Sequence, residues 1–345
     1  MSANPQSGDQ IKRKTHWGRE TIKRLVLGPR VFPDQCALGL SDPQSEIRVW
    51  LHGVGTPRDV TSRHVVAAGQ PLVIGIGMDN EDAHSIAMLS QAALVFREDD
   101  AGQRELGRIG LKWIDTVSLE TAQLHLFRVL HCENYCLPKG RLWLRYLYNN
   151  YQHWRSATRS TASKIRVSQR ELHCLFTFYI CPRPVVLVSV MDNGIGNIFP
   201  MDLIGSVADS HFSLALHATS RPVSLLENSR RIALSNIPIE QTHWAFELGK
   251  NHNKTAVDWS QVGFAITSSP SFRLPVPQFS ARVREMKIES VRTLGSHKLF
   301  LARTIADHRW SNDLQLHFIH GFYQAWRQQV PVATRSVEAA WKAES

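Results

Sequence analysis

A mainly β fold with some α-helix, built as two barrel-like halves in tandem, is the architecture that the sequence predicts. Most apolar runs are short, about four to eight residues. They are rich in Val, Ile, Leu and Phe and are bounded by Gly, Pro, Asn or Asp, as strands usually are. Several segments of the first half also recur in the second half in the same order. A chain of 345 residues is long enough for two ordinary domains.

The repeat consists of four pairs of matching segments. The first pair reads PLVIGIGMDN and PVVLVSVMDN, and each member predicts a buried strand that runs into a Met-Asp-Asn turn. The third pair ends in Tyr-Gln-x-Trp-Arg and predicts a helix in each copy. The pairs are Pro71–Asn80 with Pro184–Asn193, Leu124–Arg128 with Leu299–Arg303, Leu142–Arg155 with Leu314–Arg327, and Ala157–Ser160 with Ala333–Ser336.

The offset between the copies is not constant. It is 113 for the first pair (184 minus 71) and 175 for the second (299 minus 124), which predicts that the first copy lacks some 62 residues present in the second. The predicted organisation is a polar tail at 1–20, a degenerate barrel-like domain at 21–155, a linker at 156–164, a second domain at 165–330 and a tail at 331–345. A further helix is expected at Thr219–Ser229.

Composition narrows the class of protein. No apolar stretch approaches the roughly 20 residues that a membrane helix needs, and the first residues lack the apolar core of a signal peptide. Five cysteines are few and odd in number, which favours reduced thiols and a cytoplasmic location. The net charge of +10 favours anionic ligands in general. Nucleic-acid binding is not predicted, because no recognised motif accompanies the charge. No metal site is predicted either, since His131, Cys132 and Cys136 lack a second ligand pair.

Four motifs in the C-terminal half occur in a meaningful order. They are the strand and turn Arg183–Asp192, the strand and loop Gly196–Gly205, the strand and helix start Phe212–Leu226, and the segment Gly295–Arg303 with sequence GSHKLFLAR. Over roughly 175–327 the chain resembles the flavin reductase-like, FMN-binding split-barrel family. The last segment is similar to that family's Gly-Asp-His-x-Leu-Phe-x-Gly-x-Val signature.

The resemblance implies a split β-barrel that binds FMN, with FAD as the alternative flavin. Residues of the second and third motifs are expected to bind the flavin, with the main chain of the second motif along the ring and the third motif at the phosphate. His297 is the expected catalytic residue, placing a nicotinamide or a substrate over the flavin. The expected cofactor-binding residues are Asn197, Ile198, Pro200, Met201, His217, Ser220, Arg221 and Ser224.

The residue chemistry agrees with a phosphate site, because Ser220, Arg221 and Ser224 combine a cation with hydroxyl donors where a helix should begin. Each residue also has an ordinary alternative. Ser220 and Arg221 could be an N-cap serine and a surface arginine, Asn197 a turn residue, and His297 a strand-end histidine.

This chain departs from the family pattern at two places. Asp258-Trp259 stands where the family often has Asp-Lys, and Ala302 replaces a glycine of the signature. Trp259 could instead cover the flavin. In the first copy the stretch that would hold Arg221 is expected to be missing, and Ala122 stands in the position of His297. The first copy should therefore bind no phosphate of its own.

The expected function is that of an FMN-dependent oxidoreductase acting on its own small-molecule substrate in the cleft between the halves. NAD(P)H is the candidate electron donor. One alternative is an NAD(P)H:flavin reductase that supplies a partner monooxygenase, and another is a non-catalytic flavin- or haem-binding split barrel. Members of the family are homodimers, so the chain resembles such a dimer within one polypeptide, with a higher oligomer left open.

Overall fold

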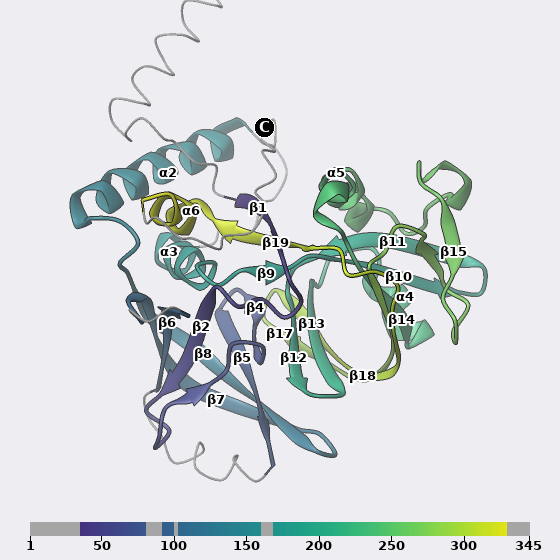
Figure 1. The fold of residues 1–345 in the computed structure, drawn as a ribbon, viewed down its shortest axis with the longest axis horizontal. Coiled ribbons are helices and arrows are strands. Elements are labelled where there is room, and N and C mark those ends of the chain that lie inside the picture. Colours follow the sequence, from purple (N-terminus) through teal and green to yellow (C-terminus); the bar gives the residue numbers. More distant parts are fainter. Residues whose placement is uncertain (1–34, 81–91, 100–102, 160–167, 330–345) are drawn as a thin grey trace, which may run out of the picture.

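The computed structural model describes residues 35–80, 92–99, 103–159 and 168–329, and these residues form a mainly β molecule (Figure 1). The prediction of a mainly β fold with some helix is confirmed. The predicted tails, 1–20 and 331–345, lie outside the described residues. The predicted linker overlaps the end of helix α2 (Lys139–Arg159), and its remainder also lies outside them. None of the described helices is both long and apolar enough to cross a membrane.

The first half contains a seven-stranded antiparallel sheet of order β3-β2-β6-β7-β8-β5-β4. Its strands are β2 (Ile47–His52), β3 (Arg58–Asp59), β4 (His64–Gly69), β5 (Leu72–Asp79), β6 (Ala92–Glu98), β7 (Glu105–Ser118) and β8 (Ala122–Asn134).

The second half contains another seven-stranded antiparallel sheet, of order β11-β10-β14-β17-β18-β13-β12. Its strands are β10 (Val186–Asp192), β11 (Ile195–Met201), β12 (Ile204–Ala208), β13 (His211–His217), β14 (Arg231–Asn236), β17 (Arg282–Leu294) and β18 (His297–Arg309). The elements between its strands are α4 (Val223–Ser229), η2 (Ile239–Gln241), α5 (Thr242–Glu247), η3 (Leu248–Asn253), η4 (Trp259–Gln261), β15 (Ile266–Ser268) and β16 (Pro275–Pro277).

Both sheets must curl, because their two edge strands are neighbours in the sequence. A flat sheet of this width would hold its edges nearly 30 Å apart at about 4.8 Å per strand. The edges β11 and β12 are joined by residues 202–203 alone, and β3 and β4 by residues 60–63. Such short connections span at most about 3.5 Å per residue, so each sheet closes toward a barrel.

The two sheets share one strand order, since β2 to β8 correspond in turn to β10, β11, β12, β13, β14, β17 and β18. Most of their β-bulges also coincide. The register shifts of β7–β8 are at Gly110/Leu111 and Trp113/Asp115, and those of β17–β18 are 175 residues later, at Glu285/Met286 and Ile288/Ser290. A further shift occurs at Val66/Ala68 in β4 and at Ser206/Ala208 in β12.

This correspondence corrects one predicted match. Pro71–Asn80 contains β5, which occupies the place of β13, whereas Pro184–Asn193 contains β10, which occupies the place of β2. The two strands are not equivalent. Each is buried along most of its length, and a buried strand reads as a continuous apolar run whatever its place in the sheet. The match of Leu124–Arg128 with Leu299–Arg303 does join equivalent strands, β8 and β18.

The predicted deletion is also misplaced. The extra residues of the second half lie between β14 and β17, and not in the connection that carries Arg221. The first-half counterpart of that connection, between β5 and β6, falls on 81–91 and lies outside the described residues. Of the two Tyr-Gln-x-Trp-Arg segments, α2 is helical throughout its match. The second begins as strand β19 (Gln315–His320) and becomes helix α6 (Gly321–Arg327) only at its end, because β19 has strand partners.

A small third sheet, β1-β19-β9, joins the two ends of the described chain. Strand β1 (Gln35–Leu40) pairs with β19, which pairs with β9 (Arg183–Pro184). Helix α3 (Gln169–Phe178) begins with a capping box between Ser168 and Glu171. Figure 1 shows α2, α3 and α6 grouped together above the first half. The core of the first half includes Phe176 of α3 and Phe322 and Trp326 of α6, so elements from late in the chain complete it.

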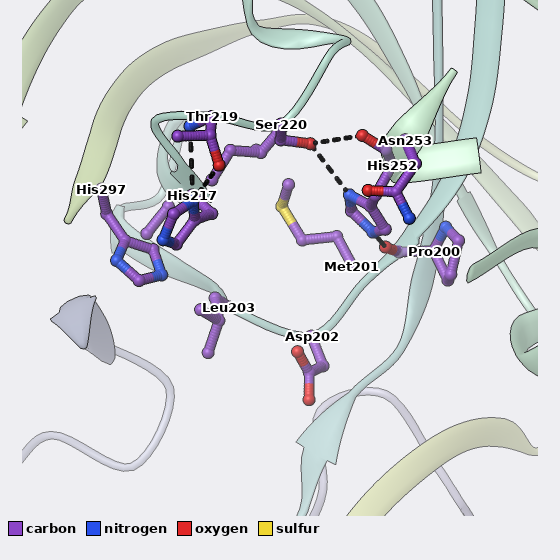
Figure 2. Close-up of a pocket in the computed structure, with 12 residues that line it drawn as sticks. Pro200, Met201, Asp202, Leu203, His217, Thr219, Ser220, His252, Asn253 and His297 are labelled. Carbon is purple, nitrogen blue, oxygen red and sulfur yellow. Dashed lines mark hydrogen bonds between the residues drawn. The ribbon is translucent and has the colours of Figure 1, made fainter. Parts of the chain in front are cut away.

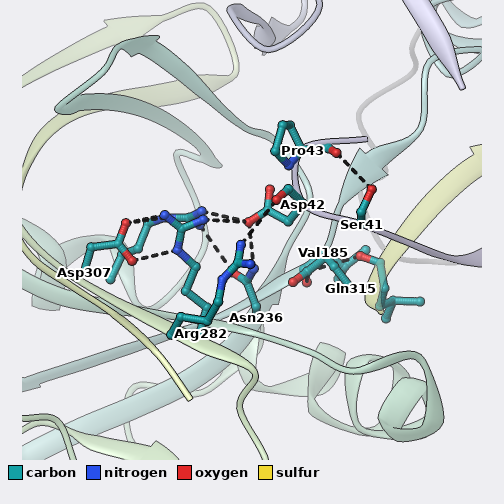
Figure 3. A network of polar contacts seen from close by, with 11 residues as sticks. Ser41, Asp42, Pro43, Val185, Asn236, Arg282, Asp307 and Gln315 are labelled. Carbon is teal, nitrogen blue, oxygen red and sulfur yellow. Dashed lines mark hydrogen bonds and ion pairs between the residues drawn. The ribbon is translucent and has the colours of Figure 1, made fainter. Parts of the chain in front are cut away.

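A polar cluster fixes the turn that follows β1 to the second half (Figure 3). The carboxylate of Asp42 accepts from Arg284 Nη2 at 2.8 Å, from Asn236 Nδ2 at 3.0 Å and from Arg282 Nη1 at 3.3 Å. Burial opposes ionisation of Asp42, yet Arg284 and the other donors hold the pKa of its carboxyl below the usual value. Arg282 and Asp307 also pair, at 2.7 Å and 2.5 Å.

The halves pack against each other through small and apolar side chains of β4, β5 and β8 on one side and β12, β13 and β18 on the other. Ala68, Leu124 and Leu126 meet Ala208 and Leu299 in one buried cluster. The backbones approach closely here. A Cβ on Gly77 would lie 2.2 Å from the carbonyl oxygen of Val207, so β5 and β12 can come this near only with glycine at position 77.

Candidate functional site

A pocket of about 340 Å³ opens in the second half, where β11, β13 and β18 meet the loop that contains η3 (Figure 2). Five residues singled out from the sequence line it together. The lining residues are Pro200, Met201, Asp202, Leu203, Ala215, Leu216, His217, Thr219, Ser220, His252, Asn253 and His297. Of these, Pro200, Met201, His217, Ser220 and His297 were predicted.

Two histidines stand side by side in the pocket. β13 ends at His217 and β18 begins at His297, and the two residues are partners in the β13–β18 register. Their rings meet edge to face with centroids 5.3 Å apart. Strand pairing therefore brings together two residues that are 80 positions apart in the sequence (297 minus 217).

The ring of His217 is held by the loop that follows it. Its Nδ1 lies 2.7 Å from Thr219 Oγ1 and accepts the Thr219 N–H at 3.3 Å. A nitrogen that accepts an N–H carries no proton, so the proton of a neutral His217 is on Nε2. That Nε2 is buried and has no hydrogen-bond partner among the described residues. A buried donor without a partner is costly, which points to a ligand acceptor at this position.

Burial lowers the pKa of His297 to about 4, and His217 lowers it further by charge repulsion. The ring of His297 is therefore neutral at physiological pH. Its Nδ1 lies 2.8 Å from Ser296 Oγ and accepts the N–H of Gly69 at 3.2 Å. Gly69 belongs to the first half, so the first half reaches the wall of this pocket.

His252, which the sequence reasoning missed, joins two walls of the pocket. Its Nε2 donates to the carbonyl oxygen of Pro200 at 2.8 Å, and Ser220 Oγ lies 3.3 Å from its Nδ1. Its own carbonyl oxygen accepts the Arg221 N–H at 3.0 Å. Burial lowers the pKa of this histidine, and its bond to Pro200 opposes that shift. The polar run Lys-Asn-His-Asn-Lys at 250–254, which stands out in a largely apolar region, could have pointed to it.

Two predicted residues face away from the pocket. Asn197 is fully buried, and its Nδ2 donates to the carbonyl oxygens of Lys254 at 2.7 Å and Asn251 at 3.2 Å. Ile198 is fully buried too, and its carbonyl oxygen accepts from Asn251 Nδ2. The side chain of Asn197 is thus bound by the η3 loop, which it anchors against β11, and its contact with a ring edge stays a prediction.

Arg221 and Ser224 lie beside the pocket and not in its lining. Helix α4 begins at Val223 with Pro222 as its N-cap, so the expected start at Thr219 is too early and Ser220 is not a cap. Ser224 is exposed, and its Oγ lies 3.4 Å from the carbonyl oxygen of Arg221. Arg221 is exposed, and its guanidinium makes no hydrogen bond or ion pair with any described residue. Among the described residues, a cation without a partner thus follows the lining residue Ser220 directly in the chain.

Three further observations near the pocket concern an ion pair, a tryptophan and possible metal ligands. Asp202 pairs with the buried Arg183 at 3.0 Å. Trp259 packs against Gly196 and joins an apolar cluster behind β11, so it does not line the pocket. Within the described part of the chain, no group of three or more His, Cys, Asp or Glu side chains is placed to hold a metal.

No protein-family model matches the chain, and no curated protein matches it. Among solved structures, an FMN-binding protein from Thermus thermophilus with bound p-hydroxybenzaldehyde is 21% identical, with a TM-score of 0.36 over 44% of this chain and 80% of its own. An NADH:FAD oxidoreductase from Streptomyces globisporus is 16% identical, with a TM-score of 0.41 over 47% and 95%. The styrene monooxygenase flavin reductase of Pseudomonas putida S12 is 18% identical, with a TM-score of 0.36 over 43% and 92%.

Proposed function

We propose that this chain is a flavin-dependent oxidoreductase that binds FMN in the pocket of the second half. The carrying observation is the buried Nε2 of His217, which has no hydrogen-bond partner among the described residues and lies beside the neutral His297 in the pocket. The donor set fits a flavin. Pro200, Met201 and Leu203 offer an apolar wall to a ring, while Ser220 and Arg221 offer a hydroxyl and a cation to a phosphate.

A bound flavin supplies the hydride and electron transfer itself. The residues of this chain would bind the flavin, orient it and shield it from water. The neutral His297 presents an uncharged donor, which suits a carbonyl oxygen or a ring nitrogen as acceptor. His252 holds the 200–203 segment against the Ser220 loop, so that one wall of the pocket keeps its shape.

The finer parts of the proposal concern the electron donor, the substrate that accepts the electrons and the cellular compartment. NAD(P)H is the proposed electron donor, and FAD is the alternative flavin. Contact between Gly69 and His297 favours a substrate held in the cleft between the halves over release of reduced flavin to a partner monooxygenase, which remains the alternative. All five cysteines are free thiols, in keeping with the proposed cytoplasmic location.

Arg221→Ala is expected to weaken FMN binding about ten- to a hundredfold, because it removes a charge-assisted contact of roughly 1.5–3 kcal/mol to the phosphate. The measurement is titration of the apoprotein by quenching of flavin fluorescence. Riboflavin, which lacks the phosphate, should bind the parent and the variant equally. Arg104→Ala, which removes an exposed arginine from the β6–β7 hairpin, is the matched control. Equal FMN affinity in Arg221→Ala and the parent would place the phosphate elsewhere.

We also propose that the chain is a tandem pair of related halves with one flavin site. The common strand order and the coinciding bulges support the pairing. In the first half, Asp79 and Ala122 occupy the β5 and β8 positions that correspond to His217 and His297. Arg63 lies 2.7 Å from Asp79 and 3.3 Å from Asp209, so the cation there already has carboxylate partners. The sequence from Asn80 to Phe96 adds Glu81 and Asp82 and no Lys or Arg.

Titration with FMN should therefore saturate near one equivalent per chain. A phosphate near Asp79 would face like charges, and Arg63, the described cation beside it, already pairs with carboxylates. Isothermal titration calorimetry gives the stoichiometry directly. Saturation at two equivalents would mean that the first half holds a flavin despite these carboxylates.

A further inference from the structure

A turn of the first half is hydrogen-bonded to the start of β18 in the second half. The N–H of Ser296 donates to the carbonyl oxygen of Gln70 at 2.9 Å, and the N–H of Gln70 donates to Ser296 Oγ at 3.1 Å. Gly295, with φ +52°, allows this approach, since a Cβ there would lie 1.9 Å from the same carbonyl oxygen. The β4–β5 turn at 69–71 is thus locked onto residues 295–297.

The contacts between this turn and residues 295–297 determine which nitrogen of His297 carries the proton. Ser296 Oγ accepts from Gln70, so its own proton is free for His297 Nδ1 at 2.8 Å. The N–H of Gly69 points at the same nitrogen from 3.2 Å. Two donors converge on Nδ1, and a protonated Nδ1 would repel both. The neutral ring consequently keeps its proton on Nε2.

We propose that Gly69 and Ser296 are positioning residues that hold His297 as the Nε2–H tautomer, so that it presents an uncharged hydrogen-bond donor to an acceptor atom of the ligand. The ligand group that faces His297 then carries an acceptor atom, such as a carbonyl oxygen or a ring nitrogen, and is not an ammonium group, which can only donate. The Nε2 of His217, on the neighbouring strand β13, is a second hydrogen-bond donor in the same pocket. The ligand identity rests on the function proposed above, whereas the tautomer does not.

The surroundings of the ring support this assignment. His217 on β13 is the titratable group that faces it, and the next residue, Lys298, is paired with Glu227. Gly69 is half-buried, and a Cβ on it would lie 3.1 Å from His297 Cε1. The ring is therefore enclosed by the turn on one side and by His217 on the other, with no carboxylate among its described contacts to stabilise a second proton.

The direct test is the ¹⁵N spectrum of histidine-labelled protein at neutral pH, without flavin, with the His297 signals assigned by their loss in His297→Gln. Expected are a protonated Nε2 and an unprotonated Nδ1 with no titration between pH 6 and 8. A protonated Nδ1, or a charged ring at neutral pH, would overturn the proposal. Because no flavin is present, this result is independent of whether the pocket binds FMN.

Variants of Ser296 give the second measurement. Ser296→Asp places an acceptor opposite Nδ1, which should add a proton there and introduce a titration of His297 into the pH range 6–8. Ser296→Ala removes one donor and should weaken FMN binding about three- to tenfold, while Ser296→Thr keeps the hydroxyl and should restore it. An unchanged His297 spectrum in Ser296→Asp, or equal FMN affinity in all four proteins, would show that Ser296 does not position the ring.

Discussion

The free energy of unfolding is expected to fall steeply as the pH drops from about 6.5 toward 4. Three fully buried histidines cause this, because burial lowers the pKa of His64 and His317 to about 4 and that of His320 to about 3. In the unfolded chain each titrates near 6.5. The unfolded state thus binds protons first, so the stability present above about pH 6.5 is lost through the window between the two values.

Each such histidine lowers the stability by up to about 1.4 kcal/mol per pH unit. Three together cost about 4 kcal/mol per unit, against a total stability of roughly 5–15 kcal/mol for an ordinary protein. The protein should therefore unfold within a few pH units below 6.5. Circular dichroism melts at several pH values between 8 and 4 give the curve, and a Tm that stays constant over this range would contradict it.

His320→Asn is the informative variant. His320 is the N-cap of α6, and its Nδ1 accepts the N–H of Phe322 at 3.1 Å. Asparagine keeps an acceptor at the N-cap but does not titrate. The variant will be less stable at pH 8, because it loses the stacking of His320 on Phe176. Its pH dependence should nevertheless be shallower by about one proton, which separates titration from packing.

Gly77→Ala is expected to separate the two halves. The new Cβ would lie 2.2 Å from the Val207 carbonyl oxygen and 2.5 Å from its Cα. Since both atoms belong to the backbone, no side chain can rotate away and β5 must move from β12. Overpacking of this kind costs about 1–3 kcal/mol, or roughly 2–4 °C in Tm for each kcal/mol in a chain of this size class.

The control for this variant is Gly140→Ala on α2, where a Cβ would meet no atom within 4 Å. That change should leave the Tm unchanged or raise it slightly, because alanine favours helix. Gly77→Ala should also weaken FMN binding, since moving β5 shifts the 69–71 turn away from His297. A parent-like Tm for Gly77→Ala would mean that the interface between the halves is far more compliant than these distances imply.

The strands and helices were predictable from the sequence because their signals are local. Short apolar runs and turn residues predicted the β architecture. The Tyr-Gln-x-Trp-Arg segments predicted helix at the C-terminal parts of α2 and α6. It was harder to predict which strands of the first half correspond to which strands of the second half. β5 and β10 are both buried and both end in Met-Asp, so sequence similarity paired them wrongly, whereas β7 and β17 show their equivalence through bulges that only strand register displays.

At the site, too, local motifs were predictable and contacts between distant segments were not. Pro200, Met201, His217, Ser220 and His297 were found from motifs that keep their order, and the pocket gathers all five. Asn197 lies outside the lining because its amide binds the carbonyl oxygens of Asn251 and Lys254, a contact with a distant segment that the motif does not show. Gly69 could not be found, because it acts through a contact with a segment distant in the sequence. His252 was missed because it has no family motif, and the polar run at 250–254 was the one local signal for it.

The pairing of β1 with β19, and the packing of α6 into the first half, govern the order in which this protein can mature on the ribosome. The first half is translated before Phe322, Tyr323 and Trp326, which complete its core. Its apolar interior consequently stays open to water until residues 322–326 have emerged. Nascent chains that stall before residue 315 should bind chaperones that recognise exposed apolar surface, and a polypeptide ending at residue 155 should aggregate instead of folding alone.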